Sequence, residues 1–523
     1  MTICLITLAM SALASGGSAP PLYSTFELVL HPSEAVEHPF LVFAEATFTD
    51  ETRSFGVDGF YDGQDTWRVR FMPDRLGTWR YSWDLCGAKG EGEFTVVDAA
   101  QPLNHGHVHR DARYPRCLVC DDGTPHYWFG GKWIAATDYL PVDGAGVPNG
   151  DAENEPIPDE TFLAYFDVVQ QKGHNGLLLK TALFPLLDDG IGWDLDWIQR
   201  AEWCVREMGK RGIYCQVNLF DTWSRKRGER SAYTTNGADH VLNVWAPGDE
   251  QAKRNYLRTL VARFAAFPNV YWELGNEMEH APNPGADFVR EANEKYLPWL
   301  REFDPYGLPV GVSESGVWTK ASVDIGFMHQ THTFPEAGGP YDRPTIMNEL
   351  VFGWEPANLY EDEAIRDPEN RFGYRRTFWR MFCSGGSGCS EATWLDLRHP
   401  LNEAVEVVME DHRCLRVFIE TLPVNINEMR TEPSFVKRGP GLGTTRAKAG
   451  ELYVTYFQLA PGFLSPAGEA CVVPRPGDYE VLWVDPKTGV TTMSRPVRAD
   501  GDTAIAHEAI HEDTVLLLRA RDQ

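Results

Sequence analysis

The sequence has few basic residues for its acidic content. Its 48 Lys and Arg stand against 75 Asp and Glu, which gives a net charge of −27. This charge favours solubility and argues against nucleic acid as a partner. Beyond its N-terminus the chain also lacks an apolar run long enough to cross a bilayer, so we expect no membrane insertion.

The ten cysteines follow no spacing that is typical of a disulfide framework. Cys117 and Cys120 form the one close CxxC pair, and no second pair completes a zinc site. Cys204 and Cys215 are expected to be small core residues. We therefore expect a protein that works without a metal or an organic cofactor.

Low-complexity linkers and long-period repeats are absent. With 523 residues, the chain is long enough to form more than one globular domain. Residues 1–21 are the exception, because the apolar run Ile3–Ala14 resembles an export signal ending at Ala12-Leu13-Ala14. No Lys or Arg precedes that run. We favour a secreted or periplasmic protein, with a cytoplasmic one as the alternative.

Two β-rich regions flank the centre of the chain. Residues 22–100 alternate apolar and polar side chains, as in Trp67–Met72, and predict an Ig-like β-sandwich. Residues 448–523 show the same alternation and predict a second small β-sandwich. Asp485–Gly489 is expected to be a turn there.

Between them, residues 110–435 alternate predicted strands and helices, which is typical of a multidomain α/β protein with a (β/α)8 TIM barrel. The predicted helices span 159–171, 194–210 and 249–266. The eight predicted strands are 127–130, 176–180, 213–218, 272–277, 309–312, 325–328, 344–349 and 392–394. By this count Glu277 ends strand four and Glu349 ends strand seven. Catalysis in such barrels takes place at the carboxyl ends of the strands.

Two glutamates that end two barrel strands are what glycoside hydrolysis requires. Retaining enzymes hold two carboxyl groups roughly 5–5.5 Å apart, one as nucleophile and one as acid. We predict Glu277 as the acid/base and Glu349 as the nucleophile, because the charge of one carboxylate raises the pKa of the other. The alternative makes Glu277 a helix-start residue and Glu349 a solvated acid.

The hexapeptide Trp272–Glu277 resembles the strand-four motif of the large clan of retaining glycoside hydrolases built on (β/α)8 barrels (clan A). Asn348-Glu349 is similar to the strand-seven nucleophile of that clan. The segment Phe60–Gly63, with Trp67–Pro73, resembles an Ig-like domain found before such barrels. Trp483–Gly489 is similar to the C-terminal β domain of apiosidase-like members.

The resemblance implies further site residues. Asn276 would bind the hydroxyl beside the anomeric carbon, and Trp394 would form a platform under the sugar, unless it belongs to the barrel wall. Members of the clan often carry a strand-six tyrosine that bonds the nucleophile. Here the segment has no tyrosine, so His329 or His332 is expected in that role.

Basic residues cluster at the predicted rim of an otherwise acidic protein. Lys132 and Lys180 follow or end strands one and two, and Arg225-Lys226-Arg227 with Arg230 lie after strand three. Arginine forks bind uronate or sulfate groups, so an acidic glycan is one hypothesis. Alternatively Lys180 pairs with Glu273 and the loop arginines are solvated.

Three more residues, Asn218, Asp221 and Trp223, are predicted sugar contacts after strand three. Asp221 could instead cap the following loop.

The sequence therefore predicts a retaining glycoside hydrolase acting on a plant, algal or microbial oligo- or polysaccharide. A transglycosylase with the same residues and a non-catalytic glycan-binding protein are the alternatives. A polysaccharide lyase ranks low, because it needs a Tyr, Lys or metal beside a uronate. The oligomeric state, the sugar and the linkage are not readable from the residues.

Overall fold

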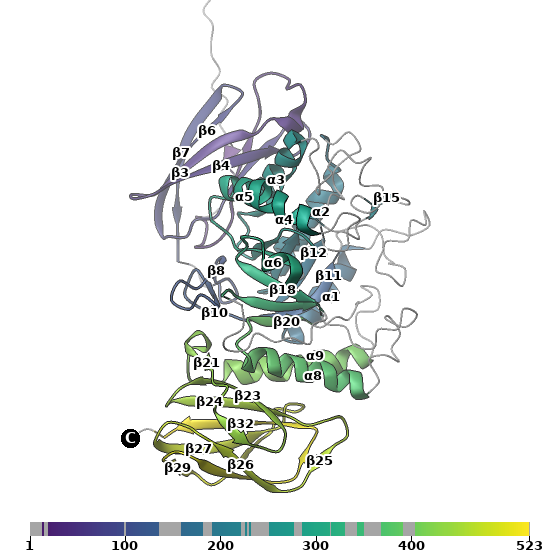
Figure 1. Cartoon of the computed structure of the whole chain (residues 1–523). Helices are drawn as coiled ribbons and strands as arrows, with labels where there is room; N and C mark the ends of the chain where they lie inside the picture. The colour runs from purple at the N-terminus through teal and green to yellow at the C-terminus, as the bar shows by residue number, and fades with distance from the viewer. Residues whose placement is uncertain are drawn as a thin grey trace, which may run out of the picture.

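The computed structural model has three parts in a row: an N-terminal β region, a central barrel and a C-terminal β region (Figure 1). No helix within the described part of the chain is long and apolar enough to cross a membrane. The structure describes residues 13–14, 19–98, 101–134, 158–180, 191–220, 225–226, 230–231, 250–276, 285–313, 315–329, 342–349, 368–390 and 403–521.

The N-terminal region is a seven-stranded antiparallel sheet that folds over on itself. One strand, β4, pairs with β3 along most of its length and with β5 at Phe60 and Tyr61. Phe48 and Phe71 stack at 4.3 Å across the two halves, so the alternating apolar residues meet in one core, as predicted. The order is β1 (Leu13–Ala14), β2 (Phe26–Leu30), β5 (Trp67–Phe71), β4 (Ser54–Tyr61), β3 (Ala44–Thr49), β6 (Gly77–Leu85) and β7 (Ala88–Val96).

The other face of β5 is not solvated but carries a buried ion cluster against the barrel helices. Arg70 is 1% exposed and donates to Glu202 Oε2 at 2.8 Å. Arg263 donates to Glu202 Oε1 at 2.7 Å. The two guanidinium groups lower the pKa of Glu202 to about 2, although burial opposes this shift. One buried carboxylate thus joins the N-terminal region to the barrel.

The central part is a closed barrel of eight parallel strands. The order around the barrel follows the chain: β11 (Trp128–Ile134), β12 (Gly176–Lys180), β13 (Tyr214–Asn218), β16 (Val270–Glu273), β17 (Val310–Ser313), β18 (Ile325–His329), β19 (Thr345–Glu349) and β20 (Gly388–Ser390). The predicted barrel is confirmed, and Glu349 is the last residue of its seventh strand.

The barrel interior is packed with side chains rather than open. Trp128 is fully buried, and its indole Nε1 donates to Ser390 Oγ at 2.8 Å. A Cβ atom at Gly176 or Gly388 would lie within 2.3 Å of Trp128 atoms, so both positions require glycine. Below this tryptophan, the small sheet of β8 (Val108–Arg110), β9 (Leu118–Cys120) and β10 (Pro125–His126) closes the amino end of the barrel with Val108, Leu118 and Cys120.

Helices connect the barrel strands, and the three predicted ones are present. The predicted helix 159–171 matches α1, and Gly173 follows it with a left-handed φ of 78°. Asp194 caps α2 by accepting from the Trp197 N–H at 3.1 Å. The helices are α1 (Asp159–Gln171), α2 (Leu195–Gly209), α3 (Glu250–Phe264), α4 (Gly285–Glu291), the π-helix Ala292–Tyr296, α5 (Leu297–Phe303), α6 (Ser315–Trp318), α8 (Pro368–Cys383) and α9 (Glu403–Glu420).

The eighth strand differs from the prediction. It was expected at 392–394, but β20 spans Gly388–Ser390 and pairs with both β19 and β11. Its residues are small because they pack under Trp128, so they lack the apolar side chains that mark a strand in sequence. Trp394 consequently lies beyond this strand, outside the described residues.

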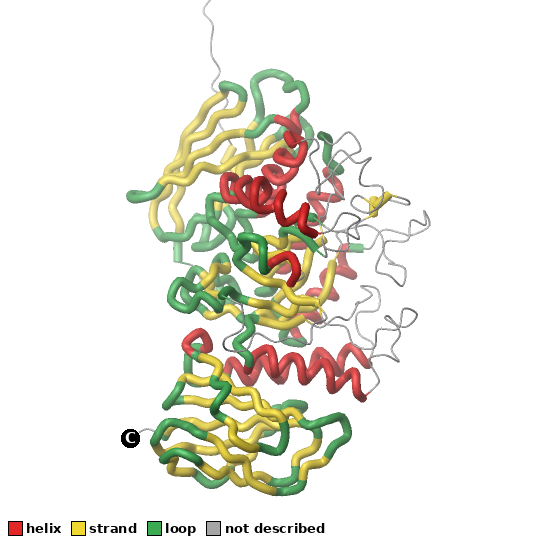
Figure 2. The backbone as a smooth tube through the Cα atoms, in the orientation of Figure 1, coloured by secondary structure: helices red, strands yellow, loops and turns green. Residues whose placement is uncertain are grey.

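The C-terminal region shares its core with the barrel. Helices α8 and α9 lie between them, side by side over one face of the C-terminal sheet (Figure 2). Trp379 of α8 stacks on Tyr456 at 6.1 Å and meets Phe418 of α9 at 5.0 Å. The main sheet has the order β21 (Arg430–Thr431), β23 (Leu442–Lys448), β24 (Leu452–Gln458), β32 (Asp513–Ala520), β27 (Gly477–Val484) and β28 (Thr491–Met493), with β29 (Val497–Ala499) paired to β27. A smaller sheet contains β22 (Val436–Arg438), β26 (Gly468–Val472) and β30 (Thr503–His507), and β25 (Leu464–Ser465) pairs with β31 (Ile510–His511).

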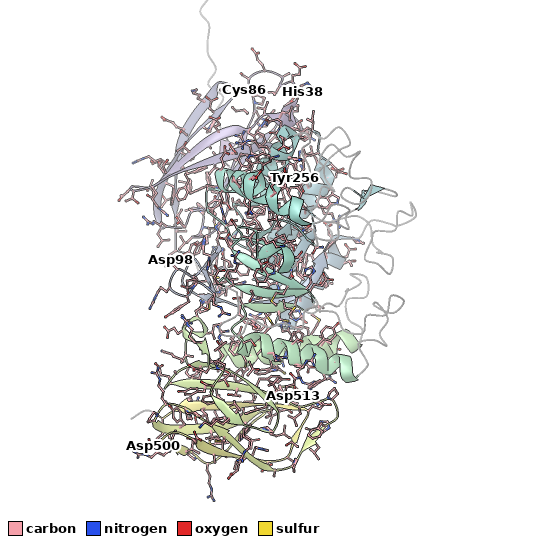
Figure 3. All side chains as sticks on the ribbon, viewed as in Figure 1. His38, Cys86, Asp98, Tyr256, Asp500 and Asp513 are labelled. Carbon is pink, nitrogen blue, oxygen red and sulfur yellow. The ribbon has the colours of Figure 1, made fainter. Side chains whose placement is uncertain are left out.

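A buried acid cluster lies at this junction, where Asp513 faces the two helices (Figure 3). Arg375 of α8 contacts Asp513 at 2.8 Å, Glu512 at 3.1 Å and Asp411 at 3.6 Å. Arg371 also contacts Asp411 at 3.5 Å and Lys487 contacts Glu512 at 2.6 Å, but Asp411 itself is only 1% exposed. Burial therefore raises the pKa of Asp411 to about 6, despite the attraction of Arg375 and Arg371.

This raised pKa predicts a pH-dependent junction. The native state binds the Asp411 proton more tightly than the unfolded chain, whose carboxyl has the ordinary pKa of 3.8. The stability from Asp411 is thus fully present below the unfolded pKa and is lost as the pH rises through about 6. We expect the free energy of unfolding of the wild type, relative to Asp411→Asn, to fall by about 2 kcal/mol between pH 4 and 7. Urea titrations at several pH values measure this difference.

The exposed Asp502 in the same region offers a matched control, Asp502→Asn. It should reproduce the pH dependence of the wild type. A constant difference between wild type and Asp411→Asn from pH 4 to 7 would contradict the raised pKa.

Candidate functional site

Polar side chains end five consecutive strands of the barrel, from the third to the seventh. Because all eight strands are parallel, these ends share one rim. All are buried or nearly so, and the largest exposed fraction is 9%, at Glu349. They are Asn218 on β13, Glu273 on β16, Ser313 on β17, His329 on β18 and Glu349 on β19.

Glu349 lies beside His329. A register shift between β18 and β19 brings the Cα atom of Glu349 level with that of His329. The Nδ1 atom of His329 is 3.7 Å from Oε2 of Glu349, which is too long for a hydrogen bond but close enough for attraction to a protonated imidazole. Of the two histidines predicted near the nucleophile, His329 occupies this position, and His332 lies outside the described residues.

Asn276 is held at the end of the fourth strand although β16 formally ends at Glu273. The Asn276 N–H donates to Phe220 O at 2.9 Å, and the Ser313 N–H donates to Gly275 O at 3.1 Å. The hydroxyl of Ser313 lies 3.2 Å from Gly275 O and 3.4 Å from Oδ1 of Asn276. These contacts fix Asn276, which is 3% exposed, on the rim between strands three and five.

Asn218 contacts protein rather than facing the solvent. Its Nδ2 atom donates to Oε2 of Glu273 at 3.0 Å and to Phe220 O at 2.9 Å. Tyr271, two residues before Glu273 on β16, has its phenol in the barrel, so Glu273 continues the inward-facing row. Asn218 and Glu273 therefore form a buried polar pair beneath the rim.

Several predicted residues are described by their backbone alone or not at all. Lys132 lies on β11, Lys180 ends β12 with its Cα paired to Asn218, and Arg225 begins the short strand β14 (Arg225–Lys226). The side chains of these three are not described. The predicted residues that lie outside the described part are Glu277, His332, Trp394, Asp221 and Trp223.

Sequence reasoning missed a second set of polar residues inside the barrel. Ser313 directly follows the predicted strand 309–312 and was not among the predicted residues, and its contact with Asn276 joins parts of the chain 37 residues apart. The amide atoms of Gln216 and Asn348 and the hydroxyl of Tyr271 are buried, without a hydrogen-bond partner among the described residues. A polar residue between two apolar ones in a buried strand, such as Gln216 between Cys215 and Val217, is the signal that could have found them.

The described residues contain no group of three or more His, Cys, Asp and Glu side chains placed to hold a metal. In the Cys117–Cys120 pair, Cys120 Sγ lies 3.3 Å from the Tyr214 hydroxyl. Burial raises the pKa of the Cys120 thiol to about 12, so it stays protonated.

Two segments of the chain match known family profiles. Residues 148–327 match the cellulase family (glycosyl hydrolase family 5), and residues 20–85 match a domain of unknown function, DUF5060. A comparison with curated proteins gives no match. The cellulase match includes Asn276 and Glu277 and ends before Glu349.

Solved structures share the whole architecture. A presumed glycoside hydrolase from Bacteroides vulgatus ATCC 8482 superposes with a TM-score of 0.69 at 16% identity, over 96% of this chain and 99% of that one. A glycoside hydrolase family 5 protein from the same organism has a TM-score of 0.56 at 12% identity, over 82% of this chain and 95% of that one. At such identities the likeness establishes the fold.

The closed barrel and the cellulase-family match together define the class of this protein: it is a glycoside hydrolase. More particularly, its barrel is similar to that of the clan A glycosidases, with β regions before and after the barrel.

The contact of Ser313 with Asn276 generates a prediction. In Ser313→Ala the amide of Asn276 loses its lateral contact, so we expect kcat/KM to fall about tenfold, since small displacements of positioning groups are costly. Hydrolysis rates on a responsive glycan measure this effect. The buried Ser465 of the C-terminal region is the matched control, and Ser465→Ala should keep the wild-type rate. Equal rates for all three proteins would contradict the role of Ser313.

Proposed function

We propose that the protein is a retaining glycoside hydrolase in which Glu349 is the nucleophile and Glu277 the acid/base. The observation that carries this proposal is the place of Glu349: it ends the seventh barrel strand, is nearly buried and lies beside His329. Glu277 directly follows Asn276. Backbone hydrogen bonds of strands three to five hold Asn276 on the same rim.

The reaction proceeds by double displacement. In the first step a carboxylate oxygen of Glu349 forms a bond to the anomeric carbon while the glycosidic C–O bond breaks. Glu277 gives its proton to the leaving oxygen. In the second step Glu277 takes a proton from water, the water oxygen bonds to the anomeric carbon, and the ester bond to Glu349 breaks.

Neighbouring groups support these steps. A protonated His329 would favour the ionised form of Glu349, because opposite charges at about 4 Å attract even near a protein surface. Asn276 would bind the hydroxyl beside the anomeric carbon, a contact that strengthens as the sugar approaches the transition state. Trp394 would supply the apolar platform below the sugar ring.

The substrate class is an oligo- or polysaccharide of plant, algal or microbial origin. The test is release of reducing sugar from a panel of neutral, uronate-rich and sulfated polymers by wild type, Glu277→Gln and Glu349→Gln. We expect the wild type to cleave at least one polymer and each variant to lose activity by at least about a thousandfold. Glu→Gln keeps the shape of each side chain, so the loss reports on ionisation.

The other outcomes separate the alternatives. Wild-type rates in both variants would sink the assigned pair of glutamates. Glycan binding without cleavage by any of the three proteins would indicate a glycan-binding protein. Products longer than the substrate, formed only by the wild type, would indicate a transglycosylase.

An acidic glycan is the more specific hypothesis. The hairpin of β14 (Arg225–Lys226) and β15 (Arg230–Ser231) follows the third barrel strand, and its register sets Lys226 opposite Arg230. Like charges directly opposite each other destabilise a hairpin, and an anionic substrate would offset that repulsion. This supports binding of uronate or sulfate groups near strand three.

The hypothesis predicts a selective loss in Arg225→Ala. We expect kcat/KM on an acidic polymer to fall about tenfold and that on a neutral one to stay the same, because an arginine–carboxylate contact is removed. Arg80→Ala, at an exposed arginine of the N-terminal region, is the control. An equal effect on both polymers, or none on either, would contradict acidic-glycan recognition.

A further inference from the structure

A small cavity of about 130 Å³ lies at the amino end of the barrel, where it meets the C-terminal region. Among the described residues, its wall contains three arginines and no aspartate or glutamate, in a chain whose acids outnumber its bases by 75 to 48. The lining residues are Tyr114, Pro115, Arg116, Cys117, Gly385, Met429, Arg430, Thr431 and Arg446.

Arg446 is fixed by backbone carbonyls. Its side chain is buried, and Nη1 donates to Phe382 O at 3.3 Å and to Gly386 O at 3.4 Å, at the carboxyl end of α8. Its Nη2 donates to Ile426 O at 3.0 Å. The Nε–H is buried without a partner among the described residues. The carbonyls hold the guanidinium in place but supply no full negative charge.

Arg430 is held on the other side of the cavity. Its Nη1 donates to Asn427 O at 2.7 Å and to Met429 O at 2.9 Å, and its guanidinium lies 4.6 Å from the centre of the Tyr114 ring. No acceptor within the described residues contacts its Nε and Nη2 atoms, and the residue is exposed. Arg430 is thus oriented while the N–H donors of Nε and Nη2 stay available.

Arg116 completes the set. Its carbonyl accepts from the Ser387 hydroxyl at 3.0 Å, which ties its backbone to the residue before β20. Burial lowers the pKa of Arg116, and the positive charges of Arg446 and Arg430 lower it further, although Cys117 opposes them. Glu428 is the nearby acid, but Lys448 binds it at 2.8 Å. Arg116 therefore lies close enough to Arg430 and Arg446 for their charges to act on it.

We propose that this cavity is a binding site for a small oxyanion, phosphate or sulfate, held by Arg116, Arg430 and Arg446. Planar guanidinium forks match oxyanion geometry and form charge-assisted hydrogen bonds. The cavity is well below the roughly 300 Å³ at which pockets for larger ligands begin, so the ligand is small. The site lies at the barrel end opposite the rim of Glu349, so it is independent of the proposed catalysis.

A bound oxyanion would join three parts of the chain. The loop carrying Arg116 leads into the small sheet under the barrel, Arg446 contacts the end of α8, and Arg430 begins the C-terminal sheet. Because the anion would bind the folded protein and not the unfolded chain, it should stabilise the fold. An exposed arginine elsewhere on the surface should not stabilise the fold in this way when the anion is added.

The experiment compares phosphate, sulfate, acetate and chloride at one ionic strength. Calorimetric titration measures the affinity of each anion, and thermal unfolding measures its effect on Tm. We expect phosphate or sulfate to raise the Tm of the wild type by about 3 °C at saturating concentration, and chloride and acetate not to. Arg116→Gln and Arg430→Gln should each bind the oxyanion at least about tenfold more weakly, as expected for loss of one charge-assisted contact.

Arg438→Gln is the matched control, at an exposed arginine of the same C-terminal region, and should bind as the wild type does. Arg116→Lys keeps the charge without the fork and serves if a glutamine variant fails to fold; it should also bind more weakly. Absence of an isotherm for phosphate and sulfate in the wild type would overturn the proposal. Unchanged affinity in the Arg116 and Arg430 variants, or a Tm that follows ionic strength whatever the anion, would overturn it equally.

Discussion

The geometry of this protein depends on the packing of one side chain, Trp128, inside the barrel. It lies on the first strand, donates from its indole to Ser390 on the eighth and packs over Gly176 on the second. It also meets Tyr271 of the fourth strand edge to face at 5.5 Å. Trp128 lies on one strand and contacts three others, so its packing determines how the sheet closes. The closure in turn determines which residues reach the rim. The position of Glu349 beside His329 is therefore a consequence of core packing.

Polar residues gather toward the carboxyl ends of the strands, although Gln216 and Thr345 are buried polar residues farther down. Trp128 and Tyr214 fill the lower barrel, whereas Asn218 and Glu273 form the pair beneath the rim. A buried carboxylate costs free energy unless it is hydrogen-bonded, so this layer stabilises the fold less than an apolar one would. Such a cost is typical of a site selected for chemistry. Hydrogen bonds between neighbouring segments also continue past Glu273, where β16 ends. The contacts with Phe220 and Ser313 hold Asn276 in place beyond that point.

The sequence was sufficient for features encoded locally. Alternation, helix stops such as Gly173 and the end of strand seven predicted the barrel and the place of Glu349, whereas strand four was expected to end at Glu277 and ends at Glu273. It was insufficient where the physics depends on contacts distant in the chain. Arg70 reads as a solvated residue of a β-strand until Glu202, 132 residues later, meets it. The strand Gly388–Ser390 has no strand signature of its own, because Trp128 dictates its small side chains. Likewise Ser313 gains its importance only through Asn276.

The two flanking regions are joined to the barrel by different forces, with different consequences for its two ends. The N-terminal region depends on Glu202, whose ionised form is stabilised by Arg70 and Arg263, so acid weakens that junction as Glu202 is protonated. The C-terminal region shares an apolar core through Trp379, and burial raises the pKa of Asp411, so this junction favours lower pH. The C-terminal region also contacts the segment before the eighth strand, because Arg446 donates to Gly386 O at 3.4 Å. The eighth strand closes the barrel on Trp128. A change that loosens the C-terminal junction should therefore alter the packing of the core and, with it, the positions of the residues on the rim.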